Sequence, residues 1–400
     1  MTFSAFCARC RKKVKKAERI IRYFDMFAGV GGFRAGLDLA GGFQCIGHCE
    51  IDKYADASYR AIHAPGKEEV YYPDARTIDP KELPDFDLLC GGFPCQAFST
   101  AGRRKGFEDA RGTLFFELAR VVKEKRPSYL FLENVPGLLS HDRGRTFGVI
   151  LSALYDLGYH VEWTVLNSKH FGVPQSRRRL FLIGYLDPRC AGKILPVFGT
   201  DAKALVQIVH GRLGKRVYDS AGIACTQDTS RQSGLYFVDL TKGDPKITAN
   251  ARCLHTRQDG SLTNFKGQNS GVLYIKEATK KGYKEAHEGD SIDLGFAGSN
   301  TRRGRVFAGV AHTVDTANTH GIVLRGGRVR RLMPRECFRL QGFNEDQIDN
   351  ILAINSDAQA YKQAGNSVTV TVIEAIGRRI RAADAELHDK EEGRDVCPTM

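Results

Sequence analysis

Between residues 20 and 186 the chain alternates short apolar runs with stretches of helical periodicity. The apolar runs are Ile20–Phe27, Gln44–Cys49, Phe86–Cys90, Tyr129–Leu132, Val161–Leu166 and Leu180–Tyr185. Two intervening stretches, Phe33–Ala40 and Leu114–Lys125, repeat apolar residues with the period of an amphipathic helix. This alternation predicts an α/β fold with a parallel sheet and helices on both faces, whose ligands bind at the carboxyl ends of the strands.

The pattern changes after Asp187. From there to about Gly327, Gly, Thr, Ser and Asn are common and helical periodicity fades, which predicts a second, irregular β-rich domain. Beyond it, Arg335–Leu340 is predicted to be a short helix. Val368–Ala383 is predicted to be a final amphipathic helix. Its expected buried face consists of Val370, Ile373, Ile376 and Ile380.

Composition narrows the classes of partner. The chain has 59 Lys and Arg against 46 Asp and Glu, a net charge of +13 that suits nucleic acid, although a merely soluble basic protein can carry it too. Because no run of about 18 apolar residues and no signal peptide is recognisable, we expect a cytoplasmic protein without membrane contact. Eleven scattered cysteines favour free thiols, and Cys7 and Cys10 lack a second pair, so we predict no metal site.

A glycine-rich segment ends the first run and opens a helix. Phe27, Gly29 and Gly31 lie in it, where glycine lets the backbone turn sharply and lie close to a ligand. Glu50 ends the second run, where an acid can accept hydrogen bonds from both ribose hydroxyls, and Asp74 is a candidate acceptor for an adenine amino group. A nicotinamide dehydrogenase or a structural turn would share this opening. The spacing departs from GxGxxG, however, and suits a nucleoside without a pyrophosphate better.

A cysteine on a proline-fixed loop follows the apolar run Phe86–Cys90. Cys95 comes directly after Pro94, and the neighbouring glycines and polar residues argue against an inert, buried thiol. Glu133 follows three apolar residues, at the end of the run Tyr129–Leu132. A helix-capping role is the alternative for this acid. Because adjacent parallel strands end at one edge, we expect the carboxyl group to face the thiol.

A basic segment precedes the last run. Alternation places Gln175, Arg177 and Arg179 on one face. Two guanidinium groups there can hold a phosphate or a base carbonyl and stabilise a thiolate. The alternative is an exposed basic edge.

In this order, these segments resemble the DNA cytosine-5 methyltransferase family over residues 20–186 and 328–380. The shared motifs are FAGxGG at Phe27–Gly32, the helix start at Arg111–Phe115, PCQ at Pro94–Gln96, ENV at Glu133–Val135, QxRxR at Gln175–Arg179, RxLxPREC with RLQGF at Arg330–Phe343, and GNSV at Gly365–Val368. The resemblance implies a Rossmann-like methyltransferase sheet that uses S-adenosylmethionine, together with a β-rich target-recognition domain.

The resemblance also implies catalytic roles. The thiolate of Cys95 would attack C6 of a cytosine flipped out of double-stranded DNA, because C5 is a poor nucleophile until C6 carries a substituent. Glu133 would bind N3 and the exocyclic amine. Arg177 and Arg179 would contact the base oxygen. Residues expected at the cofactor are Phe27, Gly29, Gly31, Glu50, Ile51, Asp74, Pro94, Leu114 and Asn366.

The resemblance suggests a division of the chain. We expect a basic tail at 1–19, a catalytic domain at 20–186 plus 344–385, a target-recognition domain at 187–343 and a tail at 386–400. In that arrangement the GNSV segment packs beside the glycine loop. We also expect a monomer associated with the nucleoid through DNA, serving restriction-modification or phage protection, with a cognate endonuclease as a genetic partner.

Three other functions would explain part of the sequence. A tRNA cytosine-5 methyltransferase of the same family would lack so long a variable domain. A catalytically dead DNA-binding relative would not need Cys95, Glu133, Arg177 and Arg179 together. An unrelated nucleotide-dependent oxidoreductase would explain the glycine loop and nothing after Leu89.

The variable region contains an internal repeat. Residues 216–229 resemble residues 305–316, and each copy continues to a glycine before an apolar pair. One interpretation is two packed β-hairpins whose core includes Val217, Ile223, Val306 and Val310. The other is that the loops after the repeated Thr-x-Asp-Thr line the major groove. Candidate base contacts are then Arg231, Gln232, Asn318 and His320.

Overall fold

The computed structural model describes most of the chain. The described residues are 19–94, 114–197, 235–236, 238–239, 246–247, 273–295, 301, 303–316, 319–324 and 329–392. Residues 1–18 of the basic tail, which include the Cys7/Cys10 pair, lie outside them, as do Cys95 and residues 216–229 of the first repeat copy. None of the described helices is long and apolar enough to cross a membrane.

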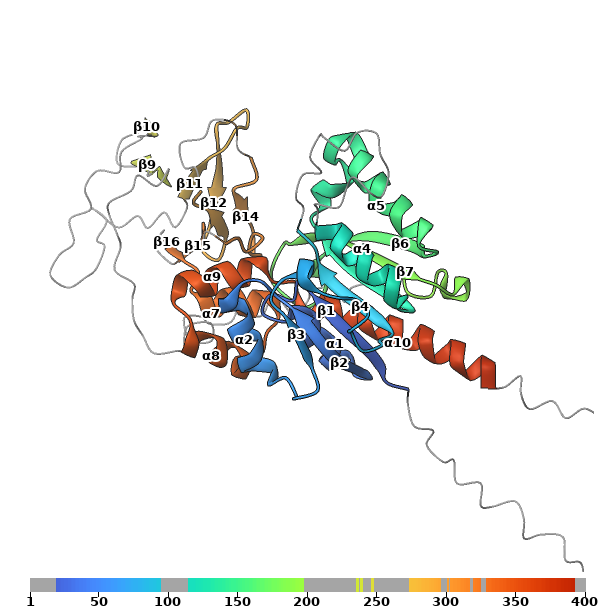
Figure 1. The fold of residues 1–400 in the computed structure, drawn as a ribbon. Helices are drawn as coiled ribbons and strands as arrows, with labels where there is room; N and C mark the ends of the chain where they lie inside the picture. Colours follow the sequence, from blue (N-terminus) through green and yellow to red (C-terminus); the bar gives the residue numbers. More distant parts are fainter. Residues whose placement is uncertain are drawn as a thin grey trace, which may run out of the picture.

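A seven-stranded sheet forms the centre of the molecule, in the order β3-β2-β1-β4-β5-β7-β6 (Figure 1). Its strands are β1 (Ile21–Met26), β2 (Phe43–Cys49), β3 (Val70–Tyr72), β4 (Leu88–Gly92), β5 (Tyr129–Asn134), β6 (His160–Asn167) and β7 (Arg178–Tyr185). All six predicted runs are strands. The sequence pattern missed only the short edge strand β3 of this sheet.

The prediction of an all-parallel sheet is wrong for one strand. β7 runs antiparallel to both β5 and β6. The link from β6 to β7, residues 168–177, contains only a single helical turn at Ser168–His170. A parallel crossover normally needs a dozen or more residues, usually with a full helix, so a link this short returns the chain antiparallel.

Helices cover both faces of the sheet, as predicted. On one face, α4 (Leu114–Lys125) and α5 (Arg145–Asp156) bury residues such as Leu118 and Ile150. On the other, α1 (Gly32–Ala40) packs against α10 (Val370–Glu392). The predicted apolar face of the last helix is fully buried, including Ile373 and Ile376 at 0% exposure. The carboxyl-terminal helix therefore belongs to the sheet layer.

A second helical group lies beside the sheet. It consists of α2 (Lys53–His63), α7 (Pro334–Gln341), α8 (Glu345–Ile354) and α9 (Asp357–Asn366). Phe338, Ile348 and Ala364 form its core. Figure 1 shows this group beside the sheet and below the β-rich region. Residues 188–197 pack instead on the α10 face of the sheet, where Ile194 is buried.

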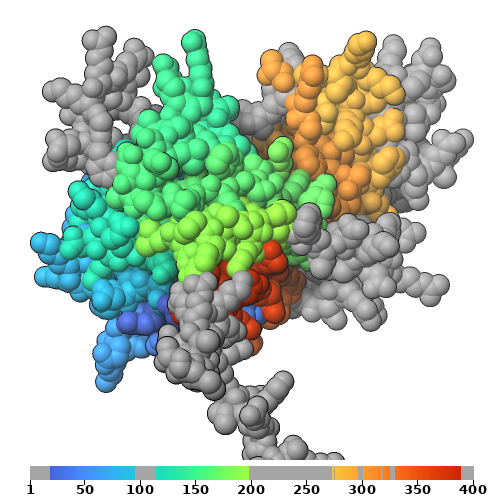
Figure 2. Space-filling model, turned by 90° about the vertical axis from the view of Figure 1, so that its right-hand side faces the viewer, coloured from blue at the N-terminus to red at the C-terminus, as the bar shows by residue number. Residues whose placement is uncertain are grey.

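The β-rich region forms small antiparallel sheets, as predicted. Their strands are β8 (Leu235–Tyr236), β9 (Val238–Asp239), β10 (Lys246–Ile247), β11 (Leu273–Lys276), β12 (Tyr283–Ala286), β13 (Ser291–Asp293), β14 (Val306–Phe307), β15 (His320–Val323) and β16 (Val329–Arg331). Ile275, Ile292 and Val323 lie in a core of its own. In Figure 2 this region and the α5 side rise as two lobes with a notch between them.

Alanine substitutions at two helical glycines are expected to have opposite effects, because Gly36 lies at the contact of α1 with α10 and Gly148 does not. A Cβ at Gly36 would lie 2.5 Å from Cβ of Ile373, so Gly36→Ala should destabilise the fold by about 1–3 kcal/mol. A Cβ at Gly148 in α5 would have no described atom within 4 Å, so Gly148→Ala should stabilise the fold by roughly 0.5–1 kcal/mol. Urea unfolding of both variants measures this. A stabilising Gly36→Ala would contradict the packing described.

Candidate active site

The candidate site lies at one edge of the sheet. The parallel strands β1, β2, β4 and β5 end there, and the antiparallel β7 begins there. Gly92, the last residue of β4, pairs with Glu133 of β5. The chain therefore enters the loop of Cys95 directly beside the Glu133 carboxyl group.

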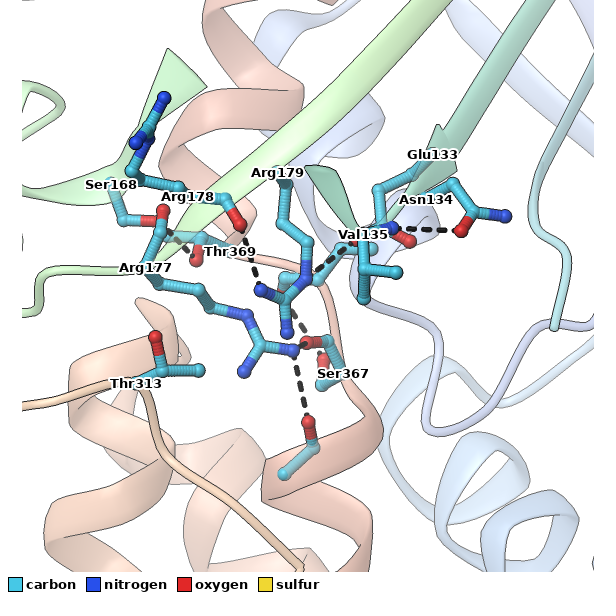
Figure 3. A network of polar contacts seen from close by, with 12 residues as sticks. Glu133, Asn134, Val135, Ser168, Arg177, Arg178, Arg179, Thr313, Ser367 and Thr369 are labelled. Atoms are coloured by element: carbon cyan, nitrogen blue, oxygen red, sulfur yellow. Dashed lines mark hydrogen bonds and ion pairs between the residues drawn. The ribbon is translucent and has the colours of Figure 1, made fainter. Parts of the chain in front are cut away.

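Glu133 forms a buried ion pair with Arg179. Nε of Arg179 lies 2.9 Å from Oε1 of Glu133, and both side chains are mostly buried (Figure 3). Burial raises the pKa of Glu133, and the guanidinium groups of Arg179 and Arg177 oppose that rise. The other carboxyl oxygen faces β4, since a Cβ on Gly92 would lie 3.0 Å from Oε2. Glu133 is thus a buried acid that an ion pair with Arg179 keeps in place, and it is not a helix cap.

The start of the cysteine loop is tied to β5. Nδ2 of Asn134 donates a 2.8 Å hydrogen bond to the carbonyl of Phe93, and Pro94 is exposed. The five cysteines among the described residues are all buried: Cys45, Cys49, Cys90, Cys190 and Cys337. Burial raises the pKa of each of these thiols. None of the five is therefore a good nucleophile.

The side chains of the basic segment alternate as predicted, but Arg177 binds backbone carbonyls where a base oxygen was expected. Figure 3 shows Arg177 and Arg179 on one side and Arg178 on the other. Arg177 is 2% exposed, and its two terminal nitrogens donate to the carbonyls of Val314, Gly365 and Ser367 at 2.7–2.9 Å. The alternative of an exposed basic edge is wrong for Arg177 and Arg179.

The glycine loop is held in left-handed backbone conformations. Phe27, Gly29 and Gly31 have φ of 61°, 57° and 80°. A Cβ at Gly31 would collide with the ring of His63 at 2.3 Å, so only glycine fits there. A Cβ at Gly29 would meet no atom of the described residues within 4 Å, which leaves space above the loop in this part of the chain.

Glu50 connects the glycine loop to the end of β2. Its Oε2 accepts a 2.7 Å hydrogen bond from the amide of Gly29, and its Oε1 accepts one of 2.7 Å from the amide of Asp52. Burial raises the pKa of Glu50, and these amides oppose the rise. Each carboxylate oxygen has a second lone pair, so the acid can still accept from a ligand.

The other predicted cofactor residues lie at the ends of strands and helices. Ile51 is 70% exposed at the end of β2, an unusual position for a large apolar side chain. Asp74 follows β3 and pairs with Arg76 at 2.6 Å. Leu114 begins α4, and Asn366 is exposed at the end of α9. The GNSV segment packs beside the loop as expected, since a Cβ on Gly32 would lie 2.8 Å from Ser367 Oγ.

Only one predicted base contact lies in the described part of the chain. His320 is 7% exposed, and its Nε2 lies 2.8 Å from the carbonyl of Thr313. Its ring also stacks on His312. The imidazole is thus part of the core of the second repeat copy, as Val306 is, and presents no exposed edge to a base. Arg231, Gln232 and Asn318 lie outside the described residues.

Sequence reasoning gave no role to several side chains that shape the site. Asn134 positions the cysteine loop, and Gln175 and Gln341, both 0% exposed, bind backbone groups of neighbouring segments. The motifs contained all three residues. Their partners are distant in sequence, and no local pattern indicates them.

Comparisons with known proteins agree with this geometry. The family model for C-5 cytosine-specific DNA methylases matches residues 21–382. The orphan methyltransferase M.SPRI of Bacillus phage SPR is 32% identical, over 90% of this chain and 97% of its own. The type II methyltransferase M.HhaI of Haemophilus parahaemolyticus is 33% identical, over 90% and 94%.

A solved structure shares the fold. It is a prophage-encoded E. coli protein assigned to the DNA modification methyltransferases, with a TM-score of 0.54 and 19% identity over 91% of this chain and 99% of its own. Family model and relatives together span the sheet, the helical group and the β-rich region. This chain therefore belongs to the C-5 cytosine-specific DNA methylase family and is a DNA cytosine-5 methyltransferase.

Proposed function

We propose that this enzyme, of the restriction-modification or phage type, methylates a flipped cytosine in one duplex sequence, with S-adenosylmethionine as methyl donor. The observation that carries the proposal is the Glu133–Arg179 pair beside the end of β4, directly before the loop of Cys95. The relatives that support a DNA substrate include phage orphan and type II methyltransferases. They do not favour the tRNA alternative.

Glu133 would hold the cytosine ring. A carboxyl group whose pKa is raised can share a proton with N3, while its other oxygen accepts from the exocyclic amine. Arg179 keeps this carboxyl oriented and is the remaining candidate for the base oxygen. Protonation at N3 draws electrons out of the ring and makes C6 electrophilic.

Cys95 would supply the nucleophile. Its thiolate forms a bond to C6, and the electrons of the C5–C6 double bond move to C5, which then accepts the methyl group. A base removes the C5 proton, and the electrons left behind restore the double bond as the sulfur leaves. The described cysteines, buried and with raised pKa values, are poor candidates for this step.

The residues at the glycine loop fit S-adenosylmethionine. Glu50 is a fixed acid that can accept from ribose hydroxyls, and the exposed Ile51 offers an apolar surface for an adenine ring. The open space above Gly29 leaves room for the rest of the nucleoside. When bound, the sulfonium supplies an electrophilic methyl group, and the chain's own residues bind and orient the two reactants.

The β-rich region would read the target sequence. We place the catalytic domain at 20–186 plus 344–385 and the recognition domain within 187–343, apart from residues 188–197 and α7, which pack with the sheet and the helical group. The duplex would lie in the notch of Figure 2. Arg231, Gln232 and Asn318 remain candidate base contacts. His320, which is buried, is no longer one. We propose a monomer without a resident metal, and a cognate endonuclease as a genetic partner.

Covalent catalysis predicts a trapped complex. Duplex DNA with 5-fluorocytosine at the target should form a stable adduct, because fluorine cannot leave as a proton does. Cys95→Ser should abolish the adduct on denaturing gels, whereas Cys337→Ser, a buried thiol of α7, should retain it. An undiminished adduct with Cys95→Ser would remove this residue from the mechanism.

The Glu50 carboxylate predicts a selective loss of cofactor affinity. Glu50→Ala should weaken S-adenosylmethionine binding by about 1.5–3 kcal/mol, which is roughly 10–150-fold, and leave DNA binding nearly intact. Calorimetry measures both affinities. The control is Glu162→Ala, because Glu162 likewise binds a loop amide, that of Gly192, at 2.7 Å. Equal cofactor affinity in the two variants would contradict the assignment of Glu50.

A further inference from the structure

A buried arginine joins three segments of the chain that are far apart in sequence. Arg177 donates from one terminal nitrogen to the carbonyl of Val314 in the β-rich region, at 2.9 Å. From the other it donates to the carbonyls of Gly365 and Ser367, at 2.9 and 2.7 Å. Figure 3 shows this side chain between the start of β7 and the Ser367 backbone.

Neighbouring contacts fix the same junction, which we define as residues 174–177, 311–316 and 364–367. Oε1 of Gln175 accepts from the amide of Val314 at 2.9 Å. The amide of Ser176 donates to the carbonyl of Ala311, and the Thr313 hydroxyl donates to the carbonyl of Ser176. The β-rich region is thus hydrogen-bonded in register to the segment that leads into β7.

The junction leads directly to the glycine loop. A Cβ on Gly365 would lie 2.6 Å from the amide nitrogen of Thr316, so the two backbones touch. On the other side of the GNSV segment, Val368 and Ser367 lie against Gly32 at the start of α1. One continuous set of backbone contacts therefore runs from the β-rich region through Arg177 to the loop assigned to the cofactor.

The chemistry of Arg177 suits a positioning role. Carbonyl oxygens occupy both terminal nitrogens, and no carboxylate pairs with this guanidinium among the described ion pairs. Removing it would leave three buried carbonyls without this donor. Lysine cannot replace it, because a single ammonium on a flexible stem lacks the planar fork that reaches both sides.

We propose that Arg177 is a positioning residue that links DNA binding by the β-rich region to cofactor binding at the glycine loop. This rests on the proposed function, since it takes the duplex and the nucleoside to bind at those two places. Linkage between two sites is reciprocal, so a bound cofactor should tighten DNA binding and DNA should tighten cofactor binding by the same factor. Arg177 is then not itself a contact to the base.

Arg305 provides a matched control. It is also 2% exposed, and its guanidinium donates to the carbonyls of Asp293 and Lys276, at 2.7 and 3.2 Å. All these groups lie inside the β-rich region. Arg305→Lys should therefore lower thermal stability as Arg177→Lys does, without touching the junction.

The test is the DNA dissociation constant with and without S-adenosylhomocysteine, for a duplex carrying the mapped target. The wild type should bind DNA at least about fivefold more tightly with the nucleoside present. Arg177→Lys should bring the ratio of the two constants close to one, and Arg305→Lys should keep the wild-type ratio. Thr313→Val removes one hydrogen bond of the junction and should lower the ratio by less than Arg177→Lys does. If Arg177→Lys does not fold, the ratio in Thr313→Val alone tests the proposal.

Any of three results would overturn the proposal. The first is a wild-type ratio of one, and the second is an equal loss of the ratio in Arg305→Lys. The third is an unchanged ratio in Arg177→Lys or, where that variant does not fold, in Thr313→Val. Failure of the wild type to methylate DNA or to bind the nucleoside would instead overturn the proposed function.

Discussion

The site depends on a carboxylate that is buried at the end of a strand. Taking Glu133 out of water is unfavourable unless a cation and hydrogen bonds replace the solvent. Arg179 supplies the cation at 2.9 Å. The residues at the end of β5 and the start of β7 must therefore lie together for the fold to be stable, and that requirement assembles the site before any substrate arrives.

The direction of β7 makes this pairing possible. In a parallel β7, the segment before it would lie at the opposite edge of the sheet from the end of β5. Because β7 runs antiparallel, Glu133 pairs with Phe181 and Asn134 with Leu180, so Arg179 reaches the carboxyl group. The same reversal brings Arg177 to the Ser367 backbone beside the glycine loop. One antiparallel strand thus connects the Glu133–Arg179 pair, the glycine loop and the β-rich region.

Sequence alone predicted the strands of the central sheet well, because their apolar runs are long and have glycine or polar residues at both ends. It also predicted the shared edge of Glu133 and the Cys95 loop, since parallel neighbours end together. It missed the reversal of β7, although the expected contact of both Glu133 and Arg179 with one cytosine required it. Strand direction depends on the length of the connecting link, and apolar periodicity carries no information on that.

Side-chain roles were harder to predict than positions. Alternation correctly placed Arg177 and Arg179 on one face, but not the carbonyls of Val314 and Gly365 that bind Arg177. His320 looked like a polar loop residue, and its burial against Thr313 follows from the packing of the repeat copy. The partners of Arg177 and of His320 depend on tertiary contacts, and no local sequence pattern indicates those contacts.

The central claim is that this edge of the sheet carries out cytosine C5 methylation at a defined duplex sequence. Bisulfite sequencing of DNA from a host that expresses the protein tests it most directly, because 5-methylcytosine resists deamination. Protected cytosines are expected at one recurring sequence. Full conversion of every cytosine, or protection scattered without a common sequence, would contradict it.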